Sequence, residues 1–412
     1  MTSSTHKPPI HILYFTAEQW PTFRPDVVAL FGKYLPRYGI TSDLVTERDL
    51  SAKNKADVAW GGGEAILCDV PHNRAGQYLV KFWHNLRVLL SVDSKKYDAI
   101  QVRDMSLTAL LGLLVARRKG IRFFYWLSFP QSEGQIDRAK NRGLKGGIRF
   151  WYPLLQGLLG KWLLYRIVLP RADHIFVQSR QMQSDIAHYG IPVSLMTAVP
   201  MGVDTEVADP DSILPVNDSR LQGKQIVAYL GTMDPFRQIG MLIHVVALVR
   251  KQIPDIFLLL VGDTEDAGHR EWLKQESIRL GVDDIVLMTG WLPSAQAWSY
   301  VRSATIGLSP FPRGFLLDSA SPTKAIEYMA LGLPVIVNNN PDQEQVIAES
   351  AGGLCVPHDA ESFAQAVLTL LKDPARCQEM GKSGKAYVNQ IRNYDNMAKK
   401  LASDYYRICQ RT

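Results

Sequence analysis

Short apolar runs of strand length alternate with helical stretches along nearly the whole chain, and this pattern restricts the fold more than any other feature. In the first half the strand-like runs are residues 10–15, 42–46, 97–102, 121–127, 174–179 and 193–199. The second half repeats the pattern with QIVAYLG, IFLLLVGD, DIVLMTG, ATIGLSP, LPVIV and GGLCVP. Strands that alternate with helices are typical of parallel sheets covered on both faces. The sequence therefore predicts an α/β fold.

The length of the chain and one polar stretch predict two domains. A chain of 412 residues is long for a single core and suits two domains of about 200 residues each. Residues 203–223 are polar, contain proline and have only weak periodicity, which is typical of a connecting segment. We expect an N-terminal domain, a linker, a C-terminal domain and a terminal helix that has Asp395 as its N-cap. Their expected bounds are 1–203, 204–223, 224–393 and 394–412.

The four cysteines and the N-terminal residues bear on the cellular compartment. Cys68, Cys355, Cys377 and Cys409 are scattered and form neither a metal-binding nor a redox pair. Reduced thiols in a cytosolic protein are therefore expected. The apolar run near the N-terminus is too short for a signal peptide. We expect a cytoplasmic protein.

Four of the strand-like runs in the second half end in a small residue, namely Gly231, Gly262, Gly290 or Ser309. Ligands of open α/β sheets bind outside the carboxyl ends of the strands, and glycine lets a ligand approach the backbone. For any one of these glycines an ordinary turn is the alternative explanation. A dinucleotide fingerprint is absent, because no G-x-G-x-x-G follows a strand-like run. The four residues together indicate a ligand-binding edge of unspecified chemistry.

The stretch SPTKAIEYM predicts a short helix with an anion site at its start. Ser321 is a suitable N-cap and Pro322 a suitable first helical residue. The free amides of Thr323 and Lys324, with the lysine charge, would then bind a phosphate. Glu327 lies one turn further on the same face, where a carboxylate can accept hydrogen bonds from a diol. A ribose diphosphate presents this combination, and the alternative is a capped helix with a Lys–Glu surface pair.

A second loop, GTMDPFRQIG at 231–240, also follows a strand-like run of the same expected sheet. It places Arg237 near the start of the next helix. The arginine fork is permanently charged and suits a diphosphate, whereas the alternative is a surface arginine. The two loops together favour a site for a diphosphate at one edge of the sheet.

Taken together, these motifs resemble the retaining glycosyltransferases of GT-B fold, family 4, also called group 1. The similarity covers nearly the whole chain, and its main elements are YLGTMDPFRQIG, ATIGLSPFP, SPTKAIEYMALGLPVIV and GGLCVPHDAESF, with ADHIFVQS and AVPMGVD in the first half. The resemblance implies two Rossmann-like domains facing a cleft. It also implies that the C-terminal domain binds a nucleotide-diphosphate sugar, that the N-terminal domain binds the acceptor, and that the last helix returns to the N-terminal domain.

The resemblance also implies roles for single residues. Glu327 corresponds to the second acid of the family's E-x7-E motif and would bind the ribose hydroxyls. The backbone from Ser321 to Lys324 would meet the donor phosphates, and Arg237 stands at the position of a phosphate-binding lysine. Leu292 would lie where the backbone meets the base, and the strand-end glycines Gly231 and Gly262 are expected at the same ligand-binding edge.

The chain departs from the family pattern at three positions. The first acid of E-x7-E is replaced by Ser319, and the neighbouring Asp318 is a candidate substitute. Thr232 stands where the family often has a second phosphate-binding arginine. Ser128 stands where many members have a histidine near the donor sugar.

The resemblance implies transfer of a sugar, with retention, from a UDP- or GDP-linked donor to a glycan or lipid-linked acceptor in cell-envelope, exopolysaccharide or glycolipid synthesis. No acidic D-x-D pair lies in the phosphate loops, so neither a metal nor another cofactor is expected; Arg237 and Lys324 would stabilise the leaving phosphate. A nucleotide-sugar epimerase of the same fold and a non-catalytic subunit are the alternatives. No nucleic-acid-binding module is recognised.

One segment accounts for the basic character of the chain. The net charge is +6, yet residues 138–172 contain no acid and eight basic residues, so the rest of the chain is slightly acidic. Within it, residues 148–170 place Trp151, Leu155, Leu158 and Trp162 on one helical face.

A helix packed on the domain core would explain the apolar face, but the uncompensated positive charge favours binding to an anionic membrane surface through 138–171. Pro153 and several charged residues argue against a membrane-spanning helix. We therefore expect a peripheral protein on the cytoplasmic leaflet. The Gly- and Lys-rich residues 132–147 predict an exposed, mobile loop.

Overall fold

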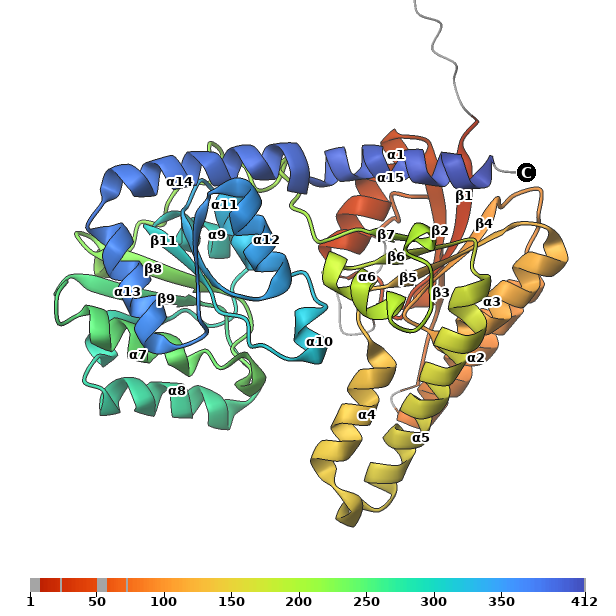
Figure 1. The fold of residues 1–412 in the computed structure, drawn as a ribbon, viewed down its shortest axis with the longest axis horizontal. Coiled ribbons are helices and arrows are strands. Elements are labelled where there is room, and N and C mark those ends of the chain that lie inside the picture. Colours follow the sequence, from red (N-terminus) through yellow and green to blue (C-terminus); the bar gives the residue numbers. More distant parts are fainter. Residues whose placement is uncertain (1–7, 23, 50–57, 72, 411–412) are drawn as a thin grey trace, which may run out of the picture. The chain divides into compact units, whose positions relative to one another are not determined.

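The computed structural model describes residues 8–22, 24–49, 58–71 and 73–410 and divides the chain into two compact units. Unit 1 comprises residues 1–200 with 394–412, and unit 2 comprises residues 201–393 (Figure 1). The expectation about a signal peptide concerns residues that lie partly outside this description, since residues 1–7 are not described.

Unit 1 is built on a seven-stranded parallel sheet in the order β3-β2-β1-β4-β5-β6-β7. Successive side chains of β1 enter opposite cores, because strand residues alternate between the two faces. The strands are β1 Ile10–Phe15, β2 Ile40–Glu47, β3 Ala65–Cys68, β4 Ala99–Arg103, β5 Arg122–Leu127, β6 His174–Val177 and β7 Met196–Ala198. A helical segment Asp26–Tyr34 leads into α1 Leu35–Arg37, and the other helices are α2 Arg74–Leu90, α3 Ser106–Lys119, α4 Gln131–Arg142, α5 Ile148–Leu163, α6 Arg180–Ala187 and α15 Tyr394–Cys409.

Unit 2 is built on a six-stranded parallel sheet in the order β10-β9-β8-β11-β12-β13. The strands are β8 Gln225–Leu230, β9 Ile256–Val261, β10 Val286–Met288, β11 Ile306–Ser309, β12 Val335–Asn338 and β13 Gly353–Val356. The helices are α7 Gly240–Val249, α8 Ala267–Arg279, α9 Ser294–Arg302, α10 Phe315–Asp318, α11 Lys324–Ala330, α12 Pro341–Ser350, α13 Ala360–Leu371 and α14 Pro374–Tyr387. Two parallel sheets with alternating helices confirm the predicted α/β class.

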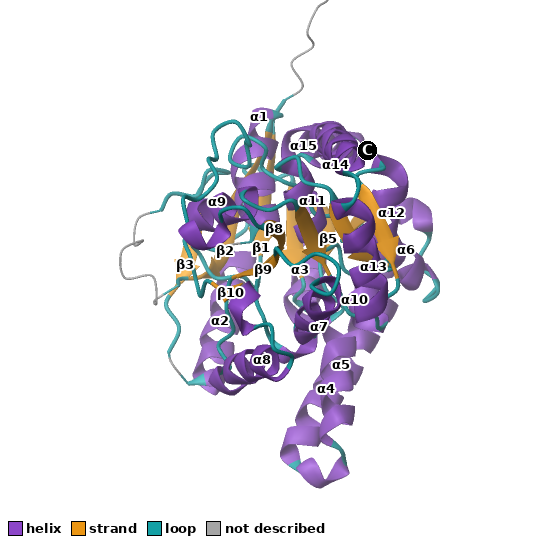
Figure 2. Cartoon of the chain, turned by 90° about the vertical axis from the view of Figure 1, so that its left-hand side faces the viewer, coloured by secondary structure: helices purple, strands orange, loops and turns teal. Residues whose placement is uncertain are grey.

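The predicted mobile loop at 132–147 is wrong, because most of it belongs to α4, which pairs with α5 (Figure 2). The pairing depends on Gly157, where an added Cβ would lie only 2.7 Å from the carbonyl oxygen of Ser132. Residues of α4 have little apolar character of their own, so packing on α5 rather than local composition stabilises this helix. Within the part of the chain that the structure describes, no helix has the length and hydropathy needed to cross a membrane.

Two further segments differ in detail from the expected pattern. The stretch 204–223 packs on α9, where the Val216 amide donates to Ser299 and Arg302 donates to the carbonyl of Pro210. Helix α15 begins at Tyr394, so the prediction of Asp395 as its N-cap is wrong by one residue or more. This helix packs on the N-terminal part of unit 1, where the Tyr406 hydroxyl donates to the carbonyl of Tyr38.

Candidate functional site

Three glycines lie together at the carboxyl ends of the strands of unit 2. Gly231 follows β8, Gly262 follows β9, and Gly290 lies just beyond β10. A Cβ added to Gly262 would lie 2.2 Å from the Gly231 carbonyl oxygen, and its φ is +128°. Gly262 and Gly290 also form an isolated bridge. The contact at Gly262 requires glycine, and these residues add no side chains of their own to the edge of the sheet.

Lys324 reaches across the end of β8 in the space that Gly231 leaves open. A Cβ at Gly231 would lie 2.8 Å from Cε and 3.1 Å from Nζ of Lys324. The ammonium lies 5.4 Å from the ring centroid of Tyr229. Helix α11 is held against the sheet because the Tyr328 hydroxyl accepts a 2.7 Å hydrogen bond from the Leu230 amide. The position of Lys324 is therefore determined by neighbours from β8 and α11 together.

Arg237 approaches the same edge from the loop after β8. Its guanidinium carbon lies 4.9 Å from the ring of Phe236 and 5.5 Å from the ring of Phe311. Its Nε atom is buried and has no hydrogen-bond partner among the described residues. The loop is held by the Met233 amide, which donates to the Asp263 carbonyl at 2.9 Å. The rings of Phe236 and Phe311 thus orient Arg237, and its Nε–H remains available to donate a hydrogen bond to a ligand.

The electrostatics of these residues suit an anionic ligand. Burial, with the nearby Arg237 charge, lowers the pKa of Lys324 to about 8, although Glu327 opposes this shift. Burial likewise raises the pKa of Glu327 against the effects of Lys324 and a hydrogen bond from Thr323. Within the described ranges neither Lys324 nor Arg237 forms an ion pair with a carboxylate. Neither cation is compensated by an ion pair, although Glu327 favours the charged form of Lys324, and a ligand with negative charge would stabilise both.

Lys324 and Glu327 are both partly buried and form no ion pair with each other in the described structure. They are therefore not the surface pair that was the alternative explanation of this motif.

The prediction that Ser321 caps the helix is wrong. Helix α11 begins at Lys324, and its N-cap Thr323 makes no side-chain capping bond. The Ser321 hydroxyl instead accepts from the Met201 amide at 2.9 Å and donates to Asp342 at 2.7 Å. Asp342 competes successfully for this hydroxyl because it is itself fixed by a buried ion pair with Arg392. Ser321 thus connects Met201, where unit 2 begins, to Asp342 of α12.

The other residues singled out in the sequence of unit 2, including those at the position of the missing acid, contact neighbouring protein groups. Asp318 forms an ion pair with Arg313 at 2.7 Å, and the buried Ser319 donates to the Phe315 carbonyl at 3.2 Å. The Thr232 carbonyl accepts from the Tyr229 hydroxyl at 2.8 Å, and Leu292 is partly buried against the core of unit 2. These contacts fix the local backbone around the candidate site.

Ser128 directly follows β5 and belongs to unit 1, the N-terminal unit. Its amide and its hydroxyl both donate to the carboxylate of Asp104, which follows β4 and has a φ of +56°. Left-handed backbone at a residue other than glycine is uncommon and often marks a functional position. Sequence reasoning singled out Ser128 but missed Asp104.

The aromatic residues of the site were also missed. Tyr229, Phe236 and Phe311 surround the cations, and Tyr328 anchors α11. The only signal in the sequence is that Tyr328 follows Glu327 directly and that Gly307 on β11 leaves room for its ring. In the described part of the chain no group of three or more His, Cys, Asp or Glu residues could hold a metal ion.

Relatives of known function resemble parts of this chain. The "MMP alpha-(1->4)-mannosyltransferase" of Mycolicibacterium hassiacum is 24% identical over 64% of this chain and 61% of that protein. The GDP-mannose-dependent phosphatidylinositol monomannoside mannosyltransferase of Mycolicibacterium smegmatis is 27% identical over 52% of this chain and 57% of that protein. The matched regions thus span little more than half the length of these relatives.

Solved structures share the fold of the whole chain. Sucrose-phosphate synthase from Thermosynechococcus elongatus has a TM-score of 0.71 with 19% identity and covers 97% of this chain and 99% of its own. Anabaena HepE in complex with UDP has a TM-score of 0.68 with 14% identity over 97% of this chain and 100% of its own.

Two family models account for most of the sequence. The glycosyl transferase 4-like domain matches residues 20–202, and the model for glycosyl transferases group 1 matches residues 216–387. The first range lies almost entirely in unit 1, and the second lies in unit 2. The chain belongs to the group 1 glycosyltransferases of GT-B fold.

Proposed function

We propose that this glycosyltransferase transfers a sugar, with retention and without a metal ion, from a UDP- or GDP-linked donor that binds to unit 2. The observation that supports this most is the pair of uncompensated cations, Lys324 and Arg237, at the carboxyl edge of its sheet. One relative is a GDP-mannose-dependent mannosyltransferase, and a structural neighbour was solved with UDP, which supports this donor class.

The chemistry follows from the charges of the site. Cleavage of the sugar–phosphate bond leaves a nucleoside diphosphate anion and an oxocarbenium-like sugar. Preformed cations beside the leaving phosphate stabilise that charge without reorganisation. Lys324 and Arg237 take this role, and the carboxylate of Glu327 accepts hydrogen bonds from the ribose hydroxyls. The leaving phosphate accepts the proton of the acceptor, so no protein base is assigned.

The acceptor is proposed to bind to unit 1 and to be a glycan or a lipid-linked glycan. Support comes from α5, whose side chains Trp151, Leu155, Leu158 and Trp162 are 50–60% exposed. A helix packed on the core would bury this face. We therefore propose that residues 138–171 bind an anionic membrane surface on its cytoplasmic side, where Lys and Arg residues contribute about 1 kcal/mol each.

Incubation of the purified protein with labelled nucleotide sugars and a lipid extract tests this function. Transfer to a lipid is the expected result, and it should persist in excess EDTA. Loss of turnover in EDTA that Mg²⁺ or Mn²⁺ restores would contradict the metal-free proposal.

The same incubation separates the alternatives. An epimerase would change the sugar without any acceptor, and a non-catalytic subunit would bind the nucleotide and form no product. Arg237→Ala should reduce turnover more than nucleotide binding, because its charge matters most as the phosphate leaves.

A further inference from the structure

Three helices of unit 1 that are separated in the sequence form one layer. Helix α3 contacts both α2 and α5, so the three lie side by side (Figure 1). Their sequences, RAGQYLVKFWHNLRVLL, SLTALLGLLVARRK and IRFWYPLLQGLLGKWL, contain no Asp or Glu. The absence of acids noted at 138–172 therefore extends over a layer assembled from three segments.

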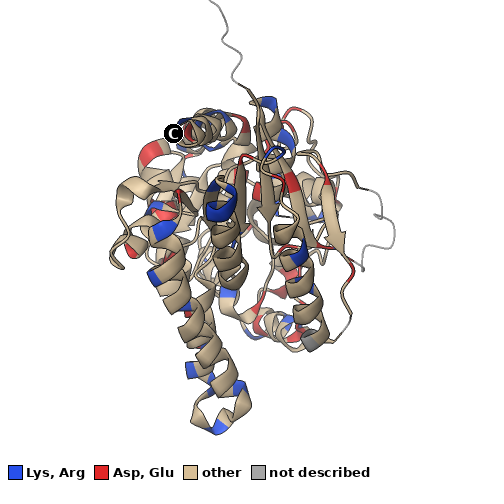
Figure 3. Ribbon diagram, turned by 90° about the vertical axis from the view of Figure 1, so that its right-hand side faces the viewer, with Lys and Arg blue, Asp and Glu red and all other residues tan. Residues whose placement is uncertain are grey.

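The basic residues of this layer are not all neutralised by neighbouring elements. Lys81, Arg117 and Lys161 form ion pairs with acids of other segments. Arg87 of α2, Arg118 and Lys119 of α3 and Arg149 of α5 are exposed and form no ion pair within the described ranges. Figure 3 looks at unit 1 from the side of these helices, where Lys and Arg segments lie along them. The layer as a whole is positively charged.

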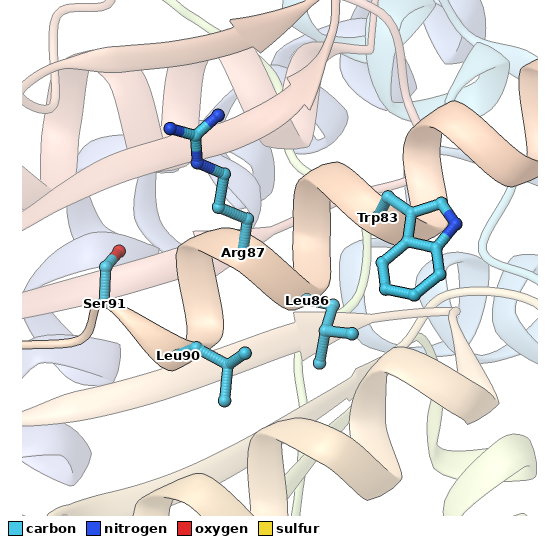
Figure 4. Close-up of a pocket in the computed structure, with 5 residues that line it drawn as sticks. All are labelled: Trp83, Leu86, Arg87, Leu90 and Ser91. Carbon is cyan, nitrogen blue, oxygen red and sulfur yellow. The ribbon is translucent and has the colours of Figure 1, made fainter.

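The outer faces of α2 and α3 are apolar as well as basic. Leu79, Trp83 and Leu90 of α2 are 60–68% exposed, and Leu107 and Leu114 of α3 are 53% and 57% exposed. The spacing within each helix places these side chains on one face. A shallow groove on α2 is lined by Trp83, Leu86, Arg87, Leu90 and Ser91; Figure 4 shows Leu86 and Leu90 on one side of the helix and the Arg87 side chain extending from another. Apolar side chains are thus bordered by an unpaired cation.

We propose that the outer faces of α2 and α3 bind an anionic lipid bilayer and form a second membrane contact beside α5. Large apolar side chains bordered by unpaired Lys and Arg match the acyl boundary and the headgroups of such a bilayer. A protein partner would need acidic groups to meet these cations, whereas an anionic leaflet supplies them over its whole surface. This inference rests on the proposed function in one respect, namely that the acceptor is linked to a membrane.

The test compares three sets of variants of the full chain by co-sedimentation with phosphatidylcholine vesicles that contain or lack phosphatidylglycerol. The first set combines Leu79→Ser, Trp83→Ser and Leu90→Ser. The second combines Trp151→Ser, Leu155→Ser and Trp162→Ser on α5. The control set replaces exposed apolar residues outside the layer, namely Val193→Ser, Leu214→Ser and Ile278→Ser, whose side chains are 48–74% exposed.

The first set should reduce binding to anionic vesicles about tenfold, because three apolar side chains no longer enter the bilayer. Binding of the parent should also fall with added salt, and the control set should bind as the parent does. An unchanged thermal transition shows that the variant is folded. An unchanged affinity for UDP or GDP shows that the substitutions on α2 do not affect the donor site.

Parent-like vesicle binding by the first set overturns this inference, whatever the second set does. If only the second set loses binding, α5 alone carries the membrane contact. If the parent sediments as a dimer without vesicles and the first set as a monomer, the occupant of this face is a second copy of the chain, and the inference is wrong.

Discussion

The two units both have charged residues near the carboxyl ends of their central strands, but they neutralise those charges differently. At the end of β4 in unit 1, the fully buried Arg103 forms a 2.6 Å ion pair with Asp26, which also pairs with Arg24. Burial alone would raise the pKa of Asp26, yet Arg103 and Arg24 lower it to about 2. At the corresponding edge of unit 2, Lys324 and Arg237 have no carboxylate partner among the described residues.

This difference indicates which edge can bind an anion. Both edges lie where the strand order of the sheet reverses, at β1 and β4 in unit 1 and at β8 and β11 in unit 2. Topology therefore makes both positions suitable for ligands. A buried cation that already has a carboxylate partner gains little from a further anion, whereas an unpaired one gains much. Charge compensation rather than topology distinguishes the two edges.

The largest expected effect tests the compensated edge. Arg103→Leu leaves the buried Asp26 without its closest partner, so the free energy of unfolding should fall by about 3–5 kcal/mol. Urea denaturation followed by circular dichroism measures it. Arg250→Leu removes the exposed ion pair with Asp284 and should cost about 0–1 kcal/mol. Equal losses of unfolding free energy for the two variants would show that burial does not determine how much an ion pair contributes to stability.

The uncompensated edge should respond in the opposite way. Lys324→Met removes a partly buried charge that has no ion-pair partner and whose pKa the fold lowers, so the empty protein should be no less stable than the parent. Its affinity for a nucleoside diphosphate should fall by about 1.5–3 kcal/mol, the value of a hydrogen bond to a charged group. Titration calorimetry measures this, with the exposed Arg279→Met as control. Parent-like affinity would remove Lys324 from the donor site.

A smaller effect concerns pH. The pKa of Lys324 lies at about 8 in the folded chain, and an anion binds its protonated form. Affinity for a nucleoside diphosphate should therefore fall as pH rises above about 8, by up to about tenfold per unit. In the empty protein the unfolded chain binds more protons at this lysine between pH 8 and 10.5, so stability rises with pH over that window. Lys324→Arg, which stays charged, should remove both slopes.

The smallest expected effect concerns the replaced acid of the family motif. Asp318 is paired with Arg313 on the surface, so Asp318→Asn should change nucleotide affinity and stability by only about 0–1 kcal/mol. Calorimetry and thermal unfolding check both quantities. A loss of affinity as large as that of Lys324→Met would show that Asp318 leaves Arg313 and serves as the missing acid.

Much of the architecture follows from local patterns in the sequence. The run 10–15 coincides with β1, and Gly231 and Gly262 directly follow β8 and β9. Lys324 and Glu327 were identified as candidates because a short helix after a strand brings its first turn to the edge of the sheet. These inferences succeed because strand alternation, helix periodicity and turn chemistry depend on residues only a few positions apart.

Other features were decided only by tertiary structure. Ser321 has the residue type of an N-cap, but its hydroxyl hydrogen-bonds Asp342 and the Met201 amide instead. The composition of α4 is typical of a loop, and its packing on α5 stabilises it as a helix. Arg103 and Asp26 are 77 positions apart, so no local pattern shows that one edge is neutralised and the other is not. The energy of a buried charge depends on which distant groups the fold places beside it. The sequence by itself thus determined the sheets and the candidate residues, and tertiary packing decided which charges remain available to a ligand.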